Sequence, residues 1–206
     1  METISTDLHE RLAARLRALR ADRGLTLDAL AERAGVSRSM ISLVERGESS
    51  PTAAVLDRLA AGLGVTLASL FADGERTDAA PVSRRAEQVA WRDPETGYVR
   101  RNLSPAGFPS PIELVEVELP AGARVVYDSP GPRAVRIAQQ VWVMEGRLEL
   151  TVGGATHLLD AGDCLAMCVE GHIVFRNPGE RATRYLVALA ADPAPSAGGG
   201  LRRNAP

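Results

Sequence analysis

Hydrophobic residues in the first third of the chain recur every three or four positions, which predicts amphipathic helices. Glycine or a Ser-Pro pair interrupts the pattern. The apolar positions are Leu8, Leu12, Leu16 and Leu19, then Leu30, Ala34, Val36, Ile41 and Val44, then Val55, Leu56, Leu59 and Leu63, and finally Leu67, Leu70 and Phe71. We expect five short helices between residues 8 and 72, with Ser50 and Pro51 as the cap and first turn of the fourth.

The centre of this helical region has the capping and turn residues of a helix-turn-helix. Thr26 can cap a first helix, Gly35 supplies a left-handed residue just past its end, and Ser37 can cap the second. Residues three or four apart share one face of a helix, so the second helix keeps an outward stripe. The stripe consists of Arg38, Ser39, Ser42, Leu43 and Arg46. Such a stripe suits a DNA major groove; the alternative is an ordinary helical hairpin inside a bundle.

The hydrophobic period changes after about residue 88, where short runs rich in Val, Ile and Leu alternate with turn residues. The runs are Tyr98–Leu103, Ile112–Leu119, Val125–Tyr127, Val141–Met144, Leu148–Val152, His157–Leu159, Ile173–Phe175 and Tyr185–Leu189. Gly153 and Gly154 mark a hairpin turn. We expect an α+β multidomain chain: an all-α domain at 8–72, a linker at 73–87, an all-β sandwich or barrel at 88–192, and a flexible tail at 193–206.

Length and composition agree with a two-domain protein of the cytoplasm. The 206 residues suffice for two cores, and the chain shows neither a bilayer-spanning apolar run nor a signal-peptide pattern. Cys164 and Cys168 lie four residues apart in a predicted strand, a separation of about 13 Å that is beyond disulfide reach. We expect both to be buried, reduced thiols.

The charge balance argues against indiscriminate DNA binding. Residues 1–75 hold nine arginines against eleven acidic residues, a net charge of −2. The chain has no lysine, so all 24 of its basic residues are arginine. Any positive charge that binds DNA must therefore be confined to one face of the domain, which predicts a modest DNA affinity for a single domain. Two linked copies that bind DNA together would compensate for this modest affinity.

The helical segment resembles the Xre/Cro family of phage-repressor-like DNA-binding domains over residues 8–72, most specifically at Ser37–Gly47. The resemblance implies a sequence-specific transcriptional regulator that binds a double-stranded DNA operator. It places Arg38, Ser39, Ser42 and Leu43 at base edges and Thr26, Ser37 and Arg46 near phosphates. It also implies an ion pair, shielded from solvent, between Arg20 and Glu45.

The remainder of the chain resembles the cupin family, a jelly-roll barrel, over about residues 110–190. The segments that carry the resemblance are Glu145–Gly154, Leu159–Asp163 and Phe175–Gly179. Metal-binding cupins carry two His and a Glu in a first motif and a third His in a second. Here these positions hold no ligand of that type: residues 132–135 include no His, Gln139 replaces Glu, and Ile173 replaces the last His, with His172 one residue out of register.

We therefore expect no metal, no cofactor and no enzymatic activity. The alternatives are a metal-dependent cupin enzyme, or a cryptic metal site using His172, Cys164 or Cys168.

A cupin register turns one set of side chains inward and another outward. The inward set is Gln139, Val141, Val143, Ile173 and Phe175, which form either a pocket for a small organic effector or a filled core. Gln140, Trp142 and Met144 point outward and predict the interface of a homodimer. A constitutive DNA-binding protein that responds to no effector is the remaining alternative.

Overall fold

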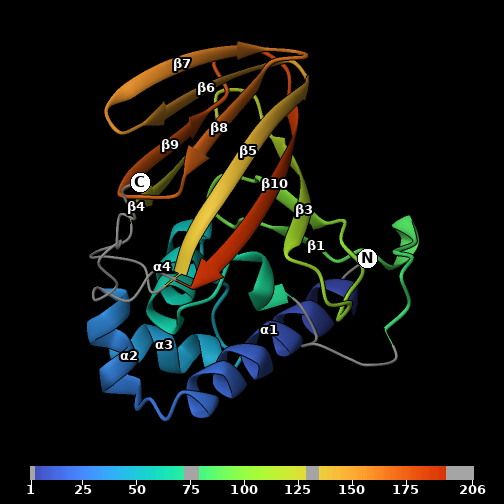
Figure 1. Ribbon diagram of the computed structural model, residues 1–206. Coiled ribbons are helices and arrows are strands. Elements are labelled where there is room, and N and C mark those ends of the chain that lie inside the picture. Colours follow the sequence, from blue (N-terminus) through green and yellow to red (C-terminus); the bar gives the residue numbers. More distant parts are fainter. Residues whose placement is uncertain (1–2, 72–78, 129–134, 194–206) are drawn as a thin grey trace, which may run out of the picture.

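The computed structural model describes residues 3–71, 79–128 and 135–193, with helices at one end and antiparallel sheets at the other (Figure 1). Residues 73–78 of the predicted linker, 132–134 of the paired-His segment and nearly all of the predicted tail lie outside these ranges. None of the helices in the described ranges is long and apolar enough to cross a membrane.

The described helical end contains four α-helices rather than five. They are α1 (Thr3–Asp22), α2 (Leu27–Ala34), α3 (Arg38–Glu45) and α4 (Ala53–Leu63). The predicted fifth helix is the 3-10 turn η1 (Ala68–Phe71). Thr66 holds its start, because the Thr66 hydroxyl accepts the Ser69 N–H at 3.0 Å. This single 3-10 turn already buries Leu70 and Phe71, two of the apolar residues from which a fifth α-helix was predicted.

The predicted start of α4 was wrong by two residues. Thr52, not Ser50, is the N-cap, and its hydroxyl accepts the Val55 N–H at 3.4 Å. Ser50 instead contacts His9 through a 3.0 Å hydrogen bond. Thr52, two residues after Ser50, has a hydroxyl that can cap a helix equally well, and the Ser50 hydroxyl is engaged by His9 instead.

The strands form two separate antiparallel sheets, so the barrel is not closed. One sheet has the order β1 (Ala90–Arg92), β2 (Val99–Asn102), β3 (Ile112–Leu119), β10 (Thr183–Pro193), β5 (Val135–Glu145) and β8 (Cys164–Cys168). The other has the order β4 (Arg124–Asp128), β9 (His172–Arg176), β6 (Arg147–Val152) and β7 (Ala155–Asp160). A short 3-10 turn, η2 (Arg85–Glu87), precedes β1.

The hairpin between β6 and β7 confirms the predicted turn. Gly153 and Gly154 have φ values of +58° and +83°, which is the left-handed backbone that a two-residue hairpin loop requires. Burial alternates along β5, where Val141 and Val143 are buried and Trp142 is exposed. This alternation is the period of two from which the strands were predicted.

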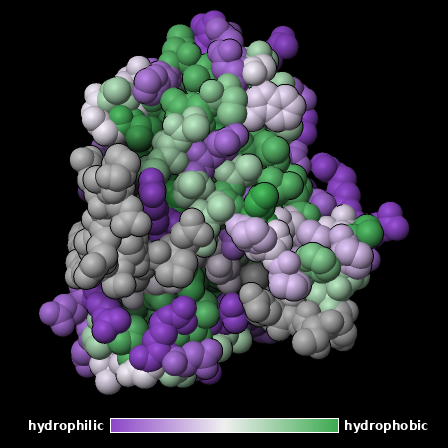
Figure 2. All heavy atoms as spheres, viewed as in Figure 1, coloured by the Kyte–Doolittle hydropathy of each residue, from purple (hydrophilic) through white to green (hydrophobic). Residues whose placement is uncertain are grey.

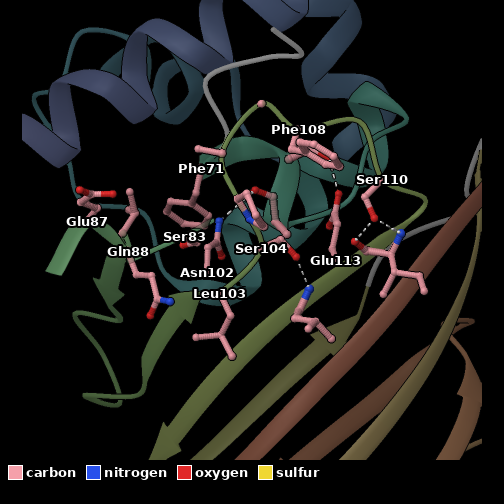
Figure 3. A pocket seen from close by; sticks show the side chains of 18 of the residues that line it. Phe71, Ser83, Glu87, Gln88, Asn102, Leu103, Ser104, Phe108, Ser110 and Glu113 are labelled. Atoms are coloured by element: carbon pink, nitrogen blue, oxygen red, sulfur yellow. Dashed lines mark hydrogen bonds between the residues drawn. The ribbon is translucent and has the colours of Figure 1, made fainter. Parts of the chain in front are cut away.

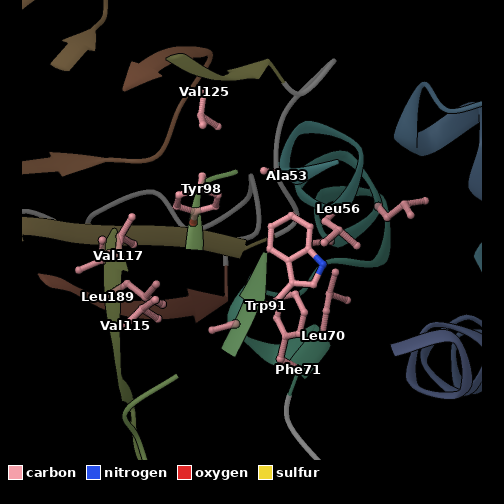
Figure 4. Packing of buried hydrophobic residues seen from close by; sticks show 14 of the residues in the cluster. Ala53, Leu56, Leu70, Phe71, Trp91, Tyr98, Val115, Val117, Val125 and Leu189 are labelled. Carbon is pink, nitrogen blue, oxygen red and sulfur yellow. The ribbon is translucent and has the colours of Figure 1, made fainter. Parts of the chain in front are cut away.

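One hydrophobic core continues from the helices into the sheets. Trp91 on β1 lies between them, with its ring centroid 5.9 Å from that of Phe71 and 6.1 Å from that of Tyr98 (Figure 4). Asp93 adds a buried polar contact, because its Oδ1 accepts the N–H of Ala53 at the start of α4, at 2.8 Å. The other oxygen accepts both donors of Thr96. The helical end is therefore seated firmly on the sheets.

Candidate nucleic-acid interface

The helix-turn-helix is present with the predicted caps. The Thr26 hydroxyl accepts the Ala29 N–H at 3.1 Å, and the Ser37 hydroxyl accepts the Met40 N–H at 3.2 Å. Gly35 ends α2 with φ +62° and ψ +32°. These caps satisfy backbone donors that the first turn of each helix leaves unpaired, which fixes where α3 begins.

Packing leaves one face of α3 outside. The residues predicted to join the two helices are buried: Leu30, Ala34, Val36, Ile41 and Val44. Of the predicted DNA-contacting residues, Thr26, Ser37, Arg38, Ser39 and Arg46 are exposed and Ser42 and Leu43 are half-buried. α3 lies at the end of the molecule away from the sheets (Figure 1). The predicted set is therefore together on an accessible surface.

Each arginine of this surface is paired with an acidic side chain, which the sequence analysis did not predict. The Arg38 Nε lies 3.2 Å from Asp28 Oδ1 on α2. Arg46 donates from Nε and Nη2 to the two carboxylate oxygens of Glu48, at 2.7 Å each, and from Nη1 to the Ser42 hydroxyl. The hydrogen bond to Arg46 lowers the pKa of Glu48 below its usual value. These carboxylates compete with a phosphate for the donors of both guanidinium groups.

The predicted ion pair between Arg20 and Glu45 is confirmed. Arg20 donates from Nε and Nη2 to Glu45 Oε1 and Oε2, at 2.7 Å each, and from Nη1 to the carbonyl of Leu25 at 2.9 Å. Their side chains are 18% and 6% exposed. The hydrogen bond to Glu45 raises the pKa of Arg20. This bidentate contact ties the end of α1 to the end of α3 and so orients the candidate DNA-reading helix.

The sheet end contains a cavity of about 60 Å³ that three of the five predicted pocket residues line. Gln139, Ile173 and Phe175 line it, whereas Val141 and Val143 are buried but do not. Sequence reasoning missed Arg100, a buried arginine on β2 that also lines this cavity. A signal was available, because Arg100 falls two residues after the buried Tyr98 and so shares its face of the strand.

A second and larger hollow, of about 540 Å³, lies between the helical end and the large sheet. Phe71, Asn102, Phe108 and Glu113 are among the side chains that surround it (Figure 3). Several of these are already engaged: Asn102 donates to the carbonyl of Ala68 at 3.4 Å, and Glu113 accepts the Thr66 hydroxyl at 2.8 Å. The hollow was not predicted, because residues distant in sequence form it.

The predicted orientations of Ile173 and His172 are confirmed. Ile173 is 1% exposed and faces the core, whereas the neighbouring His172 is exposed and lies 3.9 Å from Asp128. Within the described ranges, no group of three His, Cys, Asp or Glu residues could hold a metal ion. The expectation of buried thiols was wrong: Cys164 is exposed and Cys168 half-buried, because β8 is an edge strand.

These features define a class of protein: a capped and packed helix-turn-helix with an outward polar stripe, followed by a two-sheet antiparallel domain. Residues 16–70 match the HTH_3 helix-turn-helix family. The HTH-type transcriptional regulator SutR of Escherichia coli is 29% identical over 84% of this chain and 91% of its own length. An uncharacterized HTH-type transcriptional regulator, y4dJ of Sinorhizobium fredii, is 33% identical over 34% of this chain and 92% of its own length.

A solved HTH_3 family transcriptional regulator from Vibrio cholerae has a TM-score of 0.69 and 24% identity, over 90% of this chain and 97% of that one. This likeness shows that both ends of the chain follow a known fold. The chain belongs to the helix-turn-helix family of transcriptional regulators and carries a cupin-like C-terminal domain.

Proposed function

We propose that this protein reads a specific DNA operator with α3, acts as a homodimer and responds to a small molecule in its sheet domain. The observation that carries the first element is the outward stripe of α3. Arg38 and Ser39 are exposed at the start of the helix, where recognition helices contact base edges. Arg46 and the cap residues Thr26 and Ser37 are also exposed, and we propose that they contact phosphates. Arginine pairs with guanine and leucine can contact a thymine methyl.

The experiment that tests DNA reading is genome-wide mapping of the sites that the protein binds. We expect a small set of sites sharing one motif, with two half-sites separated by about 34 Å or a multiple of it. An Arg38→Ala variant should lose most of these sites, and an Arg33→Ala variant, which removes an exposed arginine of α2 outside the stripe, should keep them. Equal occupancy by the two variants would contradict the proposal.

Dimerisation is proposed through the outer face of the large sheet. Trp142 on β5 is 46% exposed, although it is a large apolar side chain, and its register partners are Leu186 on β10 and Cys164 on β8. Gln140 and Met144 flank it on the same face. Apolar and weakly polar atoms gather over β5 and β10 in Figure 2. Exposed patches of this kind mark contact surfaces.

Light scattering of two matched variants tests this surface. Trp142→Glu should give a monomer at micromolar concentration and lose paired half-site footprints. Leu158→Glu alters a side chain on β7 of the other sheet that is 54% exposed, and it should leave the dimer intact. A native protein that is monomeric and protects single half-sites would contradict the dimer.

The effector part of the proposal is supported by the cavity beside Gln139, Ile173 and Phe175. No metal, cofactor or enzymatic step is needed for this role. Elemental analysis that found about one transition-metal ion per chain, lost on His172→Ala, would contradict both the register and the non-enzymatic role. A regulator of this kind works where the DNA is, so the proposed location is the bacterial cytoplasm.

A further inference from the structure

The sheet cavity contains a buried positive charge, Arg100, two of whose three guanidinium nitrogens have no hydrogen-bond partner among the described residues. Arg100 on β2 stands in one row of inward-facing residues, because its register partners are Trp91 on β1 and Val117 on β3. The residue is 6% exposed, and neither its Nε nor its Nη2 has a hydrogen-bond partner among the described residues. Buried cations are ordinarily paired, so this arginine requires a reason.

The groups around Arg100 leave two of its donors without an acceptor: Asp57 lines the same cavity, yet it forms no hydrogen bond with Nε or Nη2 of Arg100. Tyr98, Tyr127 and Tyr185 line the same cavity. Burial raises the pKa of Tyr127 and of Tyr185 well above the usual phenol value, while the charge of Arg100 acts on both in the opposite direction. The phenols of Tyr127 and Tyr185 therefore stay neutral hydroxyls. A negative ligand would supply the hydrogen-bond acceptor that Nε and Nη2 of Arg100 lack.

The shape and lining of the cavity indicate the kind of anion. Nε and Nη2 form one edge of the guanidinium, a fork that matches the two oxygens of a carboxylate. The cavity measures about 60 Å³, and its other walls are largely apolar, with Ile137, Val187 and Leu189 among them. Among its described lining residues Arg100 is the one cation, and Asp57 adds negative charge, so a dianion such as phosphate would be poorly matched.

The DNA-binding end forms part of this cavity. Asp57 belongs to α4, and Thr66 and Leu67 follow that helix; all three line the cavity. α4 also contacts the sheets directly, since the Arg58 Nε donates to the carbonyl of Asp128 at 3.0 Å. A ligand in the cavity would thus touch the helical end itself, and its charge would act on the buried Asp57.

We propose that the cavity binds a short monocarboxylate through the Nε and Nη2 of Arg100, and that the bound anion changes DNA affinity through α4. The first half of this proposal, the binding half, is that the cavity binds a carboxylate, and it rests on the geometry of the cavity alone. The second half, the DNA half, is that the bound carboxylate changes DNA affinity, and it rests on the proposed function of the protein. The sequence left open whether this domain holds a small organic effector or a filled core; the charge of the proposed ligand and the residue that recognises it come from the structure.

Calorimetric titration of the full chain with acetate, propionate and the neutral propionamide tests the binding half. We expect propionate to bind with millimolar or tighter affinity and propionamide to bind at least tenfold more weakly. Arg100→Met should reduce propionate affinity at least tenfold, and Arg100→Lys, which keeps the charge but loses the fork, should do the same. Arg101→Met, one residue along and on the opposite face of β2, should leave it unchanged.

Three outcomes would overturn the binding half: equal binding of propionate and propionamide, Arg100 variants within twofold of the native affinity, or no binding by either carboxylate. The DNA half is tested separately, by fluorescence anisotropy on a fragment taken from the genomic map, with and without saturating propionate. We expect at least a threefold change in DNA affinity. An unchanged DNA affinity with propionate bound would overturn the coupling through α4. Propionate binding by a protein that has no specific DNA site would overturn the proposed regulatory function and leave the assignment of the cavity standing.

Discussion

Arginines at the two ends of the molecule lie in opposite surroundings. At the helical end Arg20, Arg38 and Arg46 are each paired with an acidic side chain, whether buried or exposed. At the sheet end Arg100 is buried with two donors unpaired among the described residues. An arginine whose donors a carboxylate occupies either stabilises the fold or must share those donors with a ligand, whereas the unused donors of a buried arginine can bind a ligand directly. Under the proposals made above, Arg20 stabilises the fold, Arg38 reads DNA and Arg100 recognises a ligand.

The largest expected effect concerns the pair that orients α3. Glu45→Gln leaves Arg20 without its carboxylate in a largely buried position, which should lower the free energy of unfolding by about 3 kcal/mol or more. Chemical denaturation measures it. Glu32→Gln, at an exposed position of α2, is the matched control and should change little. Equal stability of the two variants would show that the ion pair is peripheral.

Substitution of Arg100 should not lower the free energy of unfolding as substitution of Glu45 does. Replacing an unpaired buried cation by an apolar side chain of similar length removes a desolvation penalty, so Arg100→Met should keep the free energy of unfolding within about 1 kcal/mol of the native value or raise it. Denaturation with urea checks this. A loss as large as that of Glu45→Gln would mean that Arg100 has a structural partner and would erase the contrast between the two ends.

A smaller effect is expected from the acids that face the DNA surface. Asp28→Asn and Glu48→Gln together release Arg38 and Arg46, so binding to random DNA should tighten. Its dependence on salt should steepen by about 0.9 for each arginine that gains a phosphate. Titrations of a random duplex across a salt series measure both quantities. An unchanged slope would show that neither arginine reaches the backbone.

The smallest effect is a pH dependence at the same surface. The pKa of Glu48 is lowered by its hydrogen bond to Arg46, so its contribution to stability is present above the usual glutamate pKa of about 4.3 and is lost as the pH falls through the lower folded-state value. The melting temperatures of the native protein and Glu48→Gln should therefore differ slightly near neutral pH and converge below about pH 4. A difference that persists in acid would exclude this ion pair as its source.

Local patterns in the sequence predicted most of what local forces determine. The caps of α2 and α3 follow from single residues such as Thr26 and Ser37, and the core face of β5 follows from its alternation. The opposite orientations of His172 and Ile173 follow from register alone.

Features made by distant residues escaped prediction. Asp28 approaches Arg38 only once the turn between α2 and α3 is in place. The pairing of Arg46 with Glu48 is local, two positions apart, and was missed all the same. Asp93 reaches the start of α4 across 40 positions of sequence. Arg100 stands next to Arg101 in the sequence, and only the fold shows that it is enclosed and that its Nε and Nη2 have no hydrogen-bond partner among the described residues.

The central claim is that α3 reads bases through its outward stripe, and Arg38→Ala tests it most directly. Affinity is measured for an operator from the genomic map, for that operator with each base pair changed in turn, and for random DNA. We predict a loss of about 1–3 kcal/mol at the operator, relaxed preference at one base pair, and a much smaller loss on random DNA. An equal loss on operator and random DNA, with every base preference retained, would contradict base reading by α3.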